Sequence, residues 1–211
     1  MIDGEGNVFM AWGTNAITIV SADGQEIQTL YVDVPDEVDA EICHISLDLF
    51  DNLYVTLAGG IVNSAWTGTN PIVWKFSRLE SSDGTWRYEL AWTHTLEIDA
   101  DTTAQGLISC CHAYSAVANA LYIAVFRRGG PGPISLVVLA DLQFAAPRVV
   151  TRVILQDTGG AALTASSTPP FTLWPTDLLV RDDGAVWMSL SGSGAEAPQT
   201  YLYKNIPVSL V

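Results

Sequence analysis

A five-residue apolar motif occurs four times in this chain, each time after a turn-forming segment. Its order is aliphatic, aromatic, aliphatic, small and large apolar. The copies are Val8-Phe9-Met10-Ala11-Trp12, Leu53-Tyr54-Val55-Thr56-Leu57, Leu121-Tyr122-Ile123-Ala124-Val125 and Val186-Trp187-Met188-Ser189-Leu190. Short apolar runs between turn residues are typical of β-strands. Self-similarity at spacings of 45, 68 and 65 residues between the aromatic positions indicates an array of β-sheets.

The repeats predict an all-β chain with no helix, folded as a single domain. We expect a β-propeller with about four blades of antiparallel strands, built from units at residues 1–33, 34–98, 99–155 and 176–211. Strands beginning at Ile42, Leu107 and Leu178 are expected to be innermost and to face a common axis. Residues 129–133 and 156–175 are rich in Gly, Pro, Ser and Thr, so both predict loops.

The first predicted blade is incomplete, because Met1-Ile2-Asp3 supplies only the end of an inner strand. Unpaired strand edges are rarely left open in soluble proteins. We therefore expect the strand from Val8 to Trp12 to be covered by residues 208–211, by sequence upstream of Met1 or by another subunit. Two interpretations follow: a four-bladed ring with an irregular seam, or the C-terminal part of a larger protein.

Residues 1–31 resemble an NHL-type propeller repeat. That pattern has an Asp-Gly-Asn-like turn, an aliphatic-aromatic strand, and a further strand before another Asp-Gly turn, here Asp23-Gly24. At the predicted start of the inner strands, the positions of His44, His112 and Asp177 resemble those at which gluconolactonase and regucalcin relatives place carboxylate and Asn ligands. The Pro-Asn-Gly opening of those lactonases is absent here, and only Pro175 before Thr176 and Asp177 is similar to it.

The acidic composition excludes some partners. The net charge is −14, with 23 acidic against 9 basic residues. The only lysines are Lys75 and Lys204, and Arg127-Arg128 is the only basic doublet, so nucleic acid is not an expected partner. The apolar runs are far shorter than the roughly 20 residues of a membrane span. With no signal peptide visible, we expect a soluble protein.

Aligning the repeats places three potential metal ligands in one column. His44, His112 and Asp177 lie nine residues before Leu53, Leu121 and Val186, and the preceding column holds Cys43, Cys111 and Thr176. Imidazole and carboxylate groups on adjacent blades could share one divalent cation, zinc or iron. The alternative is a duplicated Cys-His unit whose histidines form hydrogen bonds, with Asp177 capping a turn.

Other side chains have simpler interpretations. Cys43, Cys110 and Cys111 lack metal-site spacing and are expected to be reduced, buried thiols. Aspartates in the turns are expected to bind turn amides. Of seven tryptophans, Trp66 and Trp174 fall in predicted loops and are the candidate ligand-binding residues. Tyr54 and Trp187 are expected to be buried between blades.

Two functions from different classes remain open. The first is a non-enzymatic binding or assembly module with a protein partner or neighbouring subunit, such as a structural component of a phage particle or surface appendage. The second is a metal-dependent lyase or lactonase, with its site at the mouth of the central channel. Propellers host both classes, so the predicted fold does not choose between them.

Overall fold

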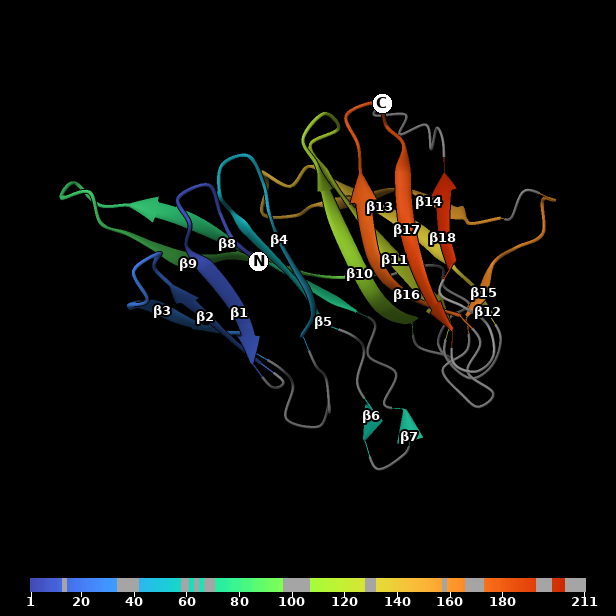
Figure 1. Cartoon of the computed structure of the whole chain (residues 1–211), viewed down its shortest axis with the longest axis horizontal. Helices are drawn as coiled ribbons and strands as arrows, with labels where there is room; N and C mark the ends of the chain where they lie inside the picture. The colour runs from blue at the N-terminus through green and yellow to red at the C-terminus, as the bar shows by residue number, and fades with distance from the viewer. Residues whose placement is uncertain are drawn as a thin grey trace.

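The computed structural model describes residues 1–12, 15–33, 42–57, 61–62, 65–66, 71–96, 107–127, 132–156, 159–165, 173–192 and 199–203. This part of the chain is all β and contains no helix, as the sequence predicts. It therefore has no helix long and apolar enough to cross a membrane. Four larger sheets and one small hairpin make up the structure (Figure 1).

Each larger sheet is a run of strands in, or nearly in, chain order. The first sheet contains β1 (Val8–Trp12), β2 (Ala16–Val20) and β3 (Glu26–Tyr31). The second contains β4 (Ile42–Leu47), β5 (Leu53–Leu57), β8 (Ile72–Glu80) and β9 (Trp86–Thr95), and β6 (Ile61–Val62) with β7 (Ala65–Trp66) forms the hairpin. The third contains β10 (Leu107–Ser115), β11 (Ala120–Arg127), β13 (Ser135–Ala140) and β14 (Arg148–Ile154). The fourth contains β12 (Gly132–Pro133), β15 (Thr164–Ala165), β16 (Leu173–Val180), β17 (Val186–Gly192) and β18 (Gln199–Tyr203).

Pairing is antiparallel throughout these sheets except between β15 and β16, which are parallel through Ala165 and Leu173. The predictions that residues 129–133 and 156–175 are loops were wrong where these segments form strands. Gly132 and Pro133 pair with Ala165 and Thr164, and β16 begins at Leu173 within the segment predicted to be a loop. Pro133 is tolerated because β12 is an edge strand of the fourth sheet, where one missing N–H does not interrupt a ladder.

Aspartate side chains hold the turns between strands, as predicted. Asp3 Oδ1 accepts hydrogen bonds from the amides of Glu5 and Asn7, and Asp48 Oδ1 does the same with the amides of Phe50 and Asn52. In both turns the asparagine side chain also donates to the second carboxylate oxygen, at 2.8 and 2.9 Å. The repeated acidic turns therefore have a structural role.

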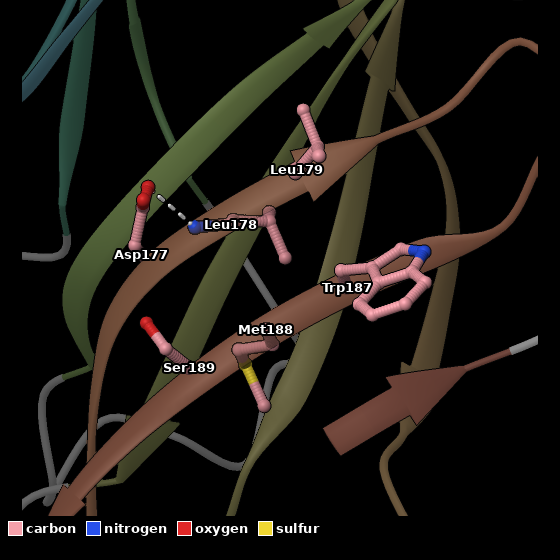
Figure 2. A pocket seen from close by; sticks show the side chains of 6 residues that line it. All are labelled: Asp177, Leu178, Leu179, Trp187, Met188 and Ser189. Carbon is pink, nitrogen blue, oxygen red and sulfur yellow. Dashed lines mark hydrogen bonds between the residues drawn. The ribbon is translucent and has the colours of Figure 1, made fainter. Parts of the chain in front are cut away.

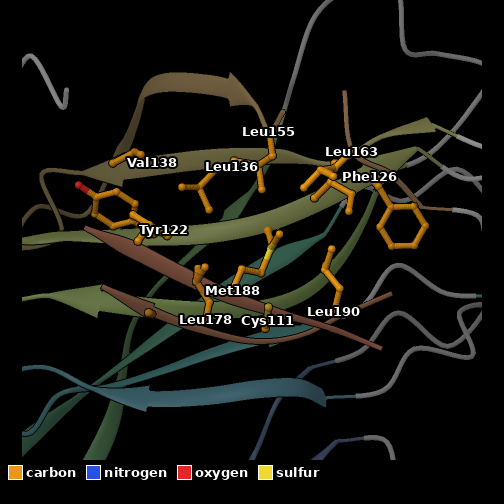
Figure 3. Close-up of a cluster of buried hydrophobic side chains, with 14 of the residues drawn as sticks. Cys111, Tyr122, Phe126, Leu136, Val138, Leu155, Leu163, Leu178, Met188 and Leu190 are labelled. Carbon is orange, nitrogen blue, oxygen red and sulfur yellow. The ribbon is translucent and has the colours of Figure 1, made fainter. Parts of the chain in front are cut away.

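Three hydrophobic cores separate the four sheets. The first core contains Phe9, Ile17 and Leu30 of the first sheet against strands of the second. The second core lies between the second and third sheets, and the third core lies between the third and fourth sheets (Figure 3). Because alternate residues of a strand point to opposite faces, each middle sheet contributes to two cores.

The repeated motif determines which residue enters which core. In β5, Leu53, Val55 and Leu57 pack toward the first sheet, whereas Tyr54 packs toward the third. The same division holds in β11, where Leu121, Ile123 and Val125 face the second sheet and Tyr122, Ala124 and Phe126 face the fourth. Motif positions one, three and five therefore face the preceding sheet, and position two faces the following one.

Trp187 departs from this arrangement. It occupies the aromatic position of the last repeat, but the fourth sheet has no described sheet after it, and Trp187 is 36% exposed. The expectation that Trp187 is buried between blades was wrong. Trp74 and Trp92 are buried as expected, whereas Trp12 on the first sheet is 57% exposed. Among the tryptophans whose side chains the structure describes, the exposed ones, Trp12 and Trp187, lie on the first and fourth sheets.

The first strands of successive sheets lie against one another. β4 contacts β1 and β10, and β10 contacts β16 (Figure 1). β4 and β10 are edge strands of their sheets, while β16 is flanked by β15 as well as β17. The described residues form no closed ring or barrel.

The first sheet begins with a fragment of a strand beside β1. Met1 and Phe9 exchange backbone hydrogen bonds, with Phe9 N donating to Met1 O at 2.8 Å and the Met1 amino group donating to Phe9 O at 3.1 Å. Ile2 forms an antiparallel bridge with Val8. β1 is otherwise the edge strand of this sheet in the described part of the chain. Met1 and Ile2 thus lie beside β1, but they form an isolated bridge and not a strand, so the interpretation of Met1-Ile2-Asp3 as the end of an inner strand stays a prediction.

Candidate functional site

The candidate site is built on β4, β10 and β16, the strands that precede the repeated motif in three sheets, and all three share a local irregularity. The pairing register shifts between Ile42 and His44 in β4, between Ser109 and Cys111 in β10, and between Pro175 and Asp177 in β16. A bulge of this kind changes which residues face the partner strand, and bulges are frequent next to functional sites. The shared bulge indicates that the three strands are structurally equivalent.

Strand pairing shows that the column read from the sequence is displaced by one residue in the third sheet. His44 pairs with Thr56 and Asp177 pairs with Ser189, each at the fourth motif position. In the third sheet that position is Ala124, and its partner is Cys111, while His112 pairs with Ile123. The turn after β10 is one residue longer than the turns after β4 and β16. The residue nine positions before the motif is therefore His112, whereas the structurally equivalent residue is Cys111. Residues that are directly opposite share a face, so His112 points toward the second sheet.

His112 is fully buried and hydrogen-bonded through both ring nitrogens. Its Nδ1 lies 2.9 Å from Thr56 Oγ1, and its Nε2 lies 2.7 Å from Ser46 Oγ. Burial, reinforced by the nearby His44, lowers the pKa of His112 well below its usual value. His112 is therefore a neutral imidazole that connects β10 to the second sheet.

His44 lies between His112 and Asp177. Its ring meets the His112 ring edge to face, with centroids 4.7 Å apart, and its Nε2 lies 3.8 Å from Asp177 Oδ1. His44 Nδ1 is buried and has no hydrogen-bond partner. Burial lowers the pKa of His44, and the Asp177 carboxylate opposes this shift only in part. The cation form of His44 is thus disfavoured.

Asp177 points away from the buried core. Its side chain is 72% exposed, and its Oδ1 accepts a hydrogen bond from the Leu178 amide at 2.8 Å (Figure 2). It lines a pocket of about 170 Å³ with Leu179, Trp187 and Ser189. The carboxylate therefore has a backbone partner of its own and contacts His44 from the solvent side.

The three residues of the predicted metal site are thus brought near one another, in a row from His112 to Asp177. No group of three His, Cys, Asp or Glu side chains in the described ranges is arranged to hold a metal ion. His112 already uses both nitrogens in hydrogen bonds, which matches the alternative interpretation of this histidine. A site for zinc or iron at His44, His112 and Asp177 stays a prediction.

The cysteines near the site are free thiols. Cys43 Sγ lies 3.1 Å from Thr56 Oγ1, and Cys111 is buried in the core between the third and fourth sheets. Burial raises the pKa of the Cys111 thiol, which keeps it protonated and unreactive. Cys110 lies in β10, where only its backbone is described. Of the two cysteines whose side chains are described, Cys111 is buried as predicted, whereas Cys43 is half-buried.

The two candidate ligand-binding tryptophans are in strands. Trp66 lies in β7 and Trp174 in β16, so the prediction that they fall in loops was wrong. Their side chains lie outside the described part of the structure, so a role in ligand binding stays a prediction.

Sequence reasoning missed a pocket beside the edge of β1. It has a volume of about 270 Å³ and is lined by Met1, Ala11 and residues 42–45. It lies between β1 and β4, beside the backbone edge of β1 at Ala11. The prediction that the edge of the strand from Val8 to Trp12 lacks a partner was the signal in the sequence that could have located it.

No family model matches the chain, and no curated protein matches it. The resemblance to NHL-type and gluconolactonase-like repeats therefore stays a prediction.

Proposed function

We propose that this chain is a non-enzymatic β-propeller-type module that binds a protein partner by accepting an extended segment at the open edge of β1. The propeller assignment is supported by the packing of the sheets. Each sheet uses one face for the preceding sheet and the other for the following sheet, and the first strands of successive sheets lie in contact. Blades of a propeller pack in this way around a central axis.

The edge of β1 is the observation that carries the proposal. Phe9 directs its N–H and C=O groups toward Met1. Because backbone groups alternate between the two edges of a strand, Ala11 directs its own groups to the same edge. No described strand pairs with Ala11 there. An extended peptide that continued the line of Met1 would satisfy these groups by strand addition.

The pocket beside this edge suits such a segment. Its walls are formed by Met1, Ala11 and the side of β4, so an added strand would lie between backbone on one side and apolar or neutral side chains on the other. His44 contributes a ring whose charged form is disfavoured by burial, because the pKa of His44 is lowered. We therefore expect an extended segment with small or apolar side chains next to β4. The net charge of −14 disfavours strongly acidic partners.

The enzyme hypothesis has less support. A metal-dependent lyase or lactonase at this position would need His112 as a ligand, yet both of its nitrogens lie within hydrogen-bonding distance of hydroxyl groups. Binding a metal ion would break one of these bonds inside a fully buried environment. We place the module in no specific assembly, and a phage particle or surface appendage stays a hypothesis from the sequence.

The proposal is tested with a displayed library of random peptides about ten residues long, selected on the purified chain. Ala11→Pro removes the edge donor but not the ladder to β2, because the Ala11 N–H points away from β2. Peptides with alternating apolar residues that bind the wild-type protein should bind Ala11→Pro at least about tenfold more weakly. Selected peptides that bind both proteins equally, or a failure to select any, would contradict strand addition at β1.

A further inference from the structure

The first and last sheets each present one exposed face. On the first sheet this face carries motif positions one, three and five of β1, which are Val8, Met10 and Trp12, with Tyr31 of β3 beside them. Trp12 is 57% exposed and Tyr31 is 69% exposed. Large aromatic side chains with this exposure on a sheet face indicate an interaction surface.

The exposed face of the last sheet lies on β16 and β17. Asp177 and Leu179 project from β16, and Trp187 and Ser189 project from β17, around the pocket of about 170 Å³ (Figure 2). Leu179 is 58% exposed. Leu178 and Met188, which alternate with them, enter the core against the third sheet on the opposite face. This surface is therefore apolar, with Asp177 at one end.

The chain forms the same kind of interface three times, once between each pair of neighbouring sheets. The two exposed faces correspond to the two sides of such an interface, each without a described partner sheet. Between each pair of neighbouring sheets, the aromatic residue at motif position two packs against positions one, three and five of the next repeat. Phe9 packs with Leu53, Val55 and Leu57; Tyr54 with Leu121, Ile123 and Val125; and Tyr122 with Val186, Met188 and Leu190. Trp187 is the fourth such aromatic residue, and Val8, Met10 and Trp12 are the fourth such set of partners.

We propose that a second copy of this chain continues the series, with Trp187 of one copy packed against Val8, Met10 and Trp12 of the other. This inference rests on the propeller-type packing proposed above. The contact is head to tail, because one face of each copy meets a different face of its partner. The four larger sheets described in each copy give eight in a pair of copies, which is within the four to eight blades typical of propellers. A ring of two copies would therefore cover both end faces of each copy.

The chemistry of the two faces fits this arrangement. On the first sheet's face Val8, Met10 and Trp12 offer uncharged side chains to the indole of Trp187. The same face carries Thr18 and Thr29 beside Met10, and Glu26 accepts a hydrogen bond from Thr29 Oγ1 across β2 from Val8. Asp177 is the one charged residue among those that line the pocket on the last sheet, and it remains next to His44. Burying a tryptophan among aliphatic residues and a second aromatic side chain is typical of the centre of a stable interface.

Two single-cysteine substitutions test the contact. We would prepare Trp187→Cys and Met10→Cys proteins separately, mix them and treat the mixture with a short bis-maleimide. Head-to-tail packing predicts that the mixture gives a cross-linked product that joins one Trp187→Cys chain to one Met10→Cys chain. Each variant treated separately should show only the cross-linking that the wild-type cysteines produce. Cross-linking of Trp187→Cys with itself would indicate a face-to-face dimer and would overturn the proposal, as would an absence of cross-linking in the mixture.

Sedimentation velocity supplies the second measurement. The wild-type chain of 22.7 kDa should form a species of twice that mass and no larger series. Trp187→Asp should weaken dimerisation by about tenfold or more, because it places a charge at the centre of the contact. Phe50→Asp is the matched control, since Phe50 is a 75% exposed aromatic residue in a turn, and it should leave dimerisation unchanged. A monomer at all concentrations would overturn the proposal.

Failure here is distinguishable from failure of the proposed function. The second copy covers sheet faces, whereas the peptide segment pairs with the backbone edge at Ala11. A chain that binds selected peptides but stays monomeric would retain the proposed function and lose this inference. Ala11→Pro should in turn leave the cross-link between Trp187→Cys and Met10→Cys intact.

Discussion

At the scale of single residues, the histidines connect the candidate site to stability. His112 is completely buried among neutral groups, and His44 is partly buried beside it. Burial lowers the pKa of both imidazoles in the folded protein. In the unfolded chain they should titrate near the usual value of about 6.5. The unfolded state therefore binds more protons than the folded state once the pH falls below that value.

We predict that the free energy of unfolding decreases as the pH falls below about 6.5, by at most about 1.4 kcal/mol per pH unit for each histidine. Urea melts near neutral pH and about one and a half pH units lower would measure the decrease. His112→Gln keeps a polar group near Ser46 and Thr56 but does not titrate, so its pH dependence should be weaker than that of the wild type. The same slope in both proteins would contradict a depressed pKa for His112.

At the scale of elements, most strands could be predicted because turn residues and period-two apolar patterns mark them locally. The inner strand of the second sheet, for example, begins at Ile42 as expected. The pairing of Gly132 and Pro133 with β15 could not be predicted, because it joins segments about 30 residues apart and has no local pattern. The proximity of His44, His112 and Asp177 was anticipated from the repeats. Their hydrogen-bond partners were not, because one extra turn residue shifts the register of β10.

The aromatic position of the repeat gives a prediction at this scale. Tyr54 is fully buried between the second and third sheets, and its hydroxyl donates to Asp48 at 3.1 Å. Tyr54→Ala should lower the free energy of unfolding by roughly 3–5 kcal/mol, because it leaves a cavity in a core. Trp187→Ala, measured in the same denaturant melts under dilute conditions, should cost less than half as much, because no described sheet covers Trp187. Equal losses at both positions would mean that the last sheet is covered within one chain.

At the scale of the whole molecule, the described residues form a series of sheets in which no described strand pairs with β1 at Ala11 and no described sheet covers the outer faces of the first and fourth sheets. The interfaces between these sheets are rich in apolar contacts. The edge of β1 accommodates a strand, and the end faces accommodate another sheet. Both features follow from a repeat that needs neighbours on each side to be complete. An assembly module is the function that uses these features.

Hydrogen exchange of individual amides, followed by NMR on the purified chain, tests whether the edge of β1 is open at Ala11. We predict that the Ala11 amide exchanges at least about a hundredfold faster than the amides of Met10 and Thr56. Met10 donates toward β2, and Thr56 lies in β5 between two strands of its sheet. Addition of a selected peptide should slow exchange at Ala11 alone. Protection of Ala11 equal to that of Met10 and Thr56 in the isolated chain would show that the edge is already paired, and would contradict the account.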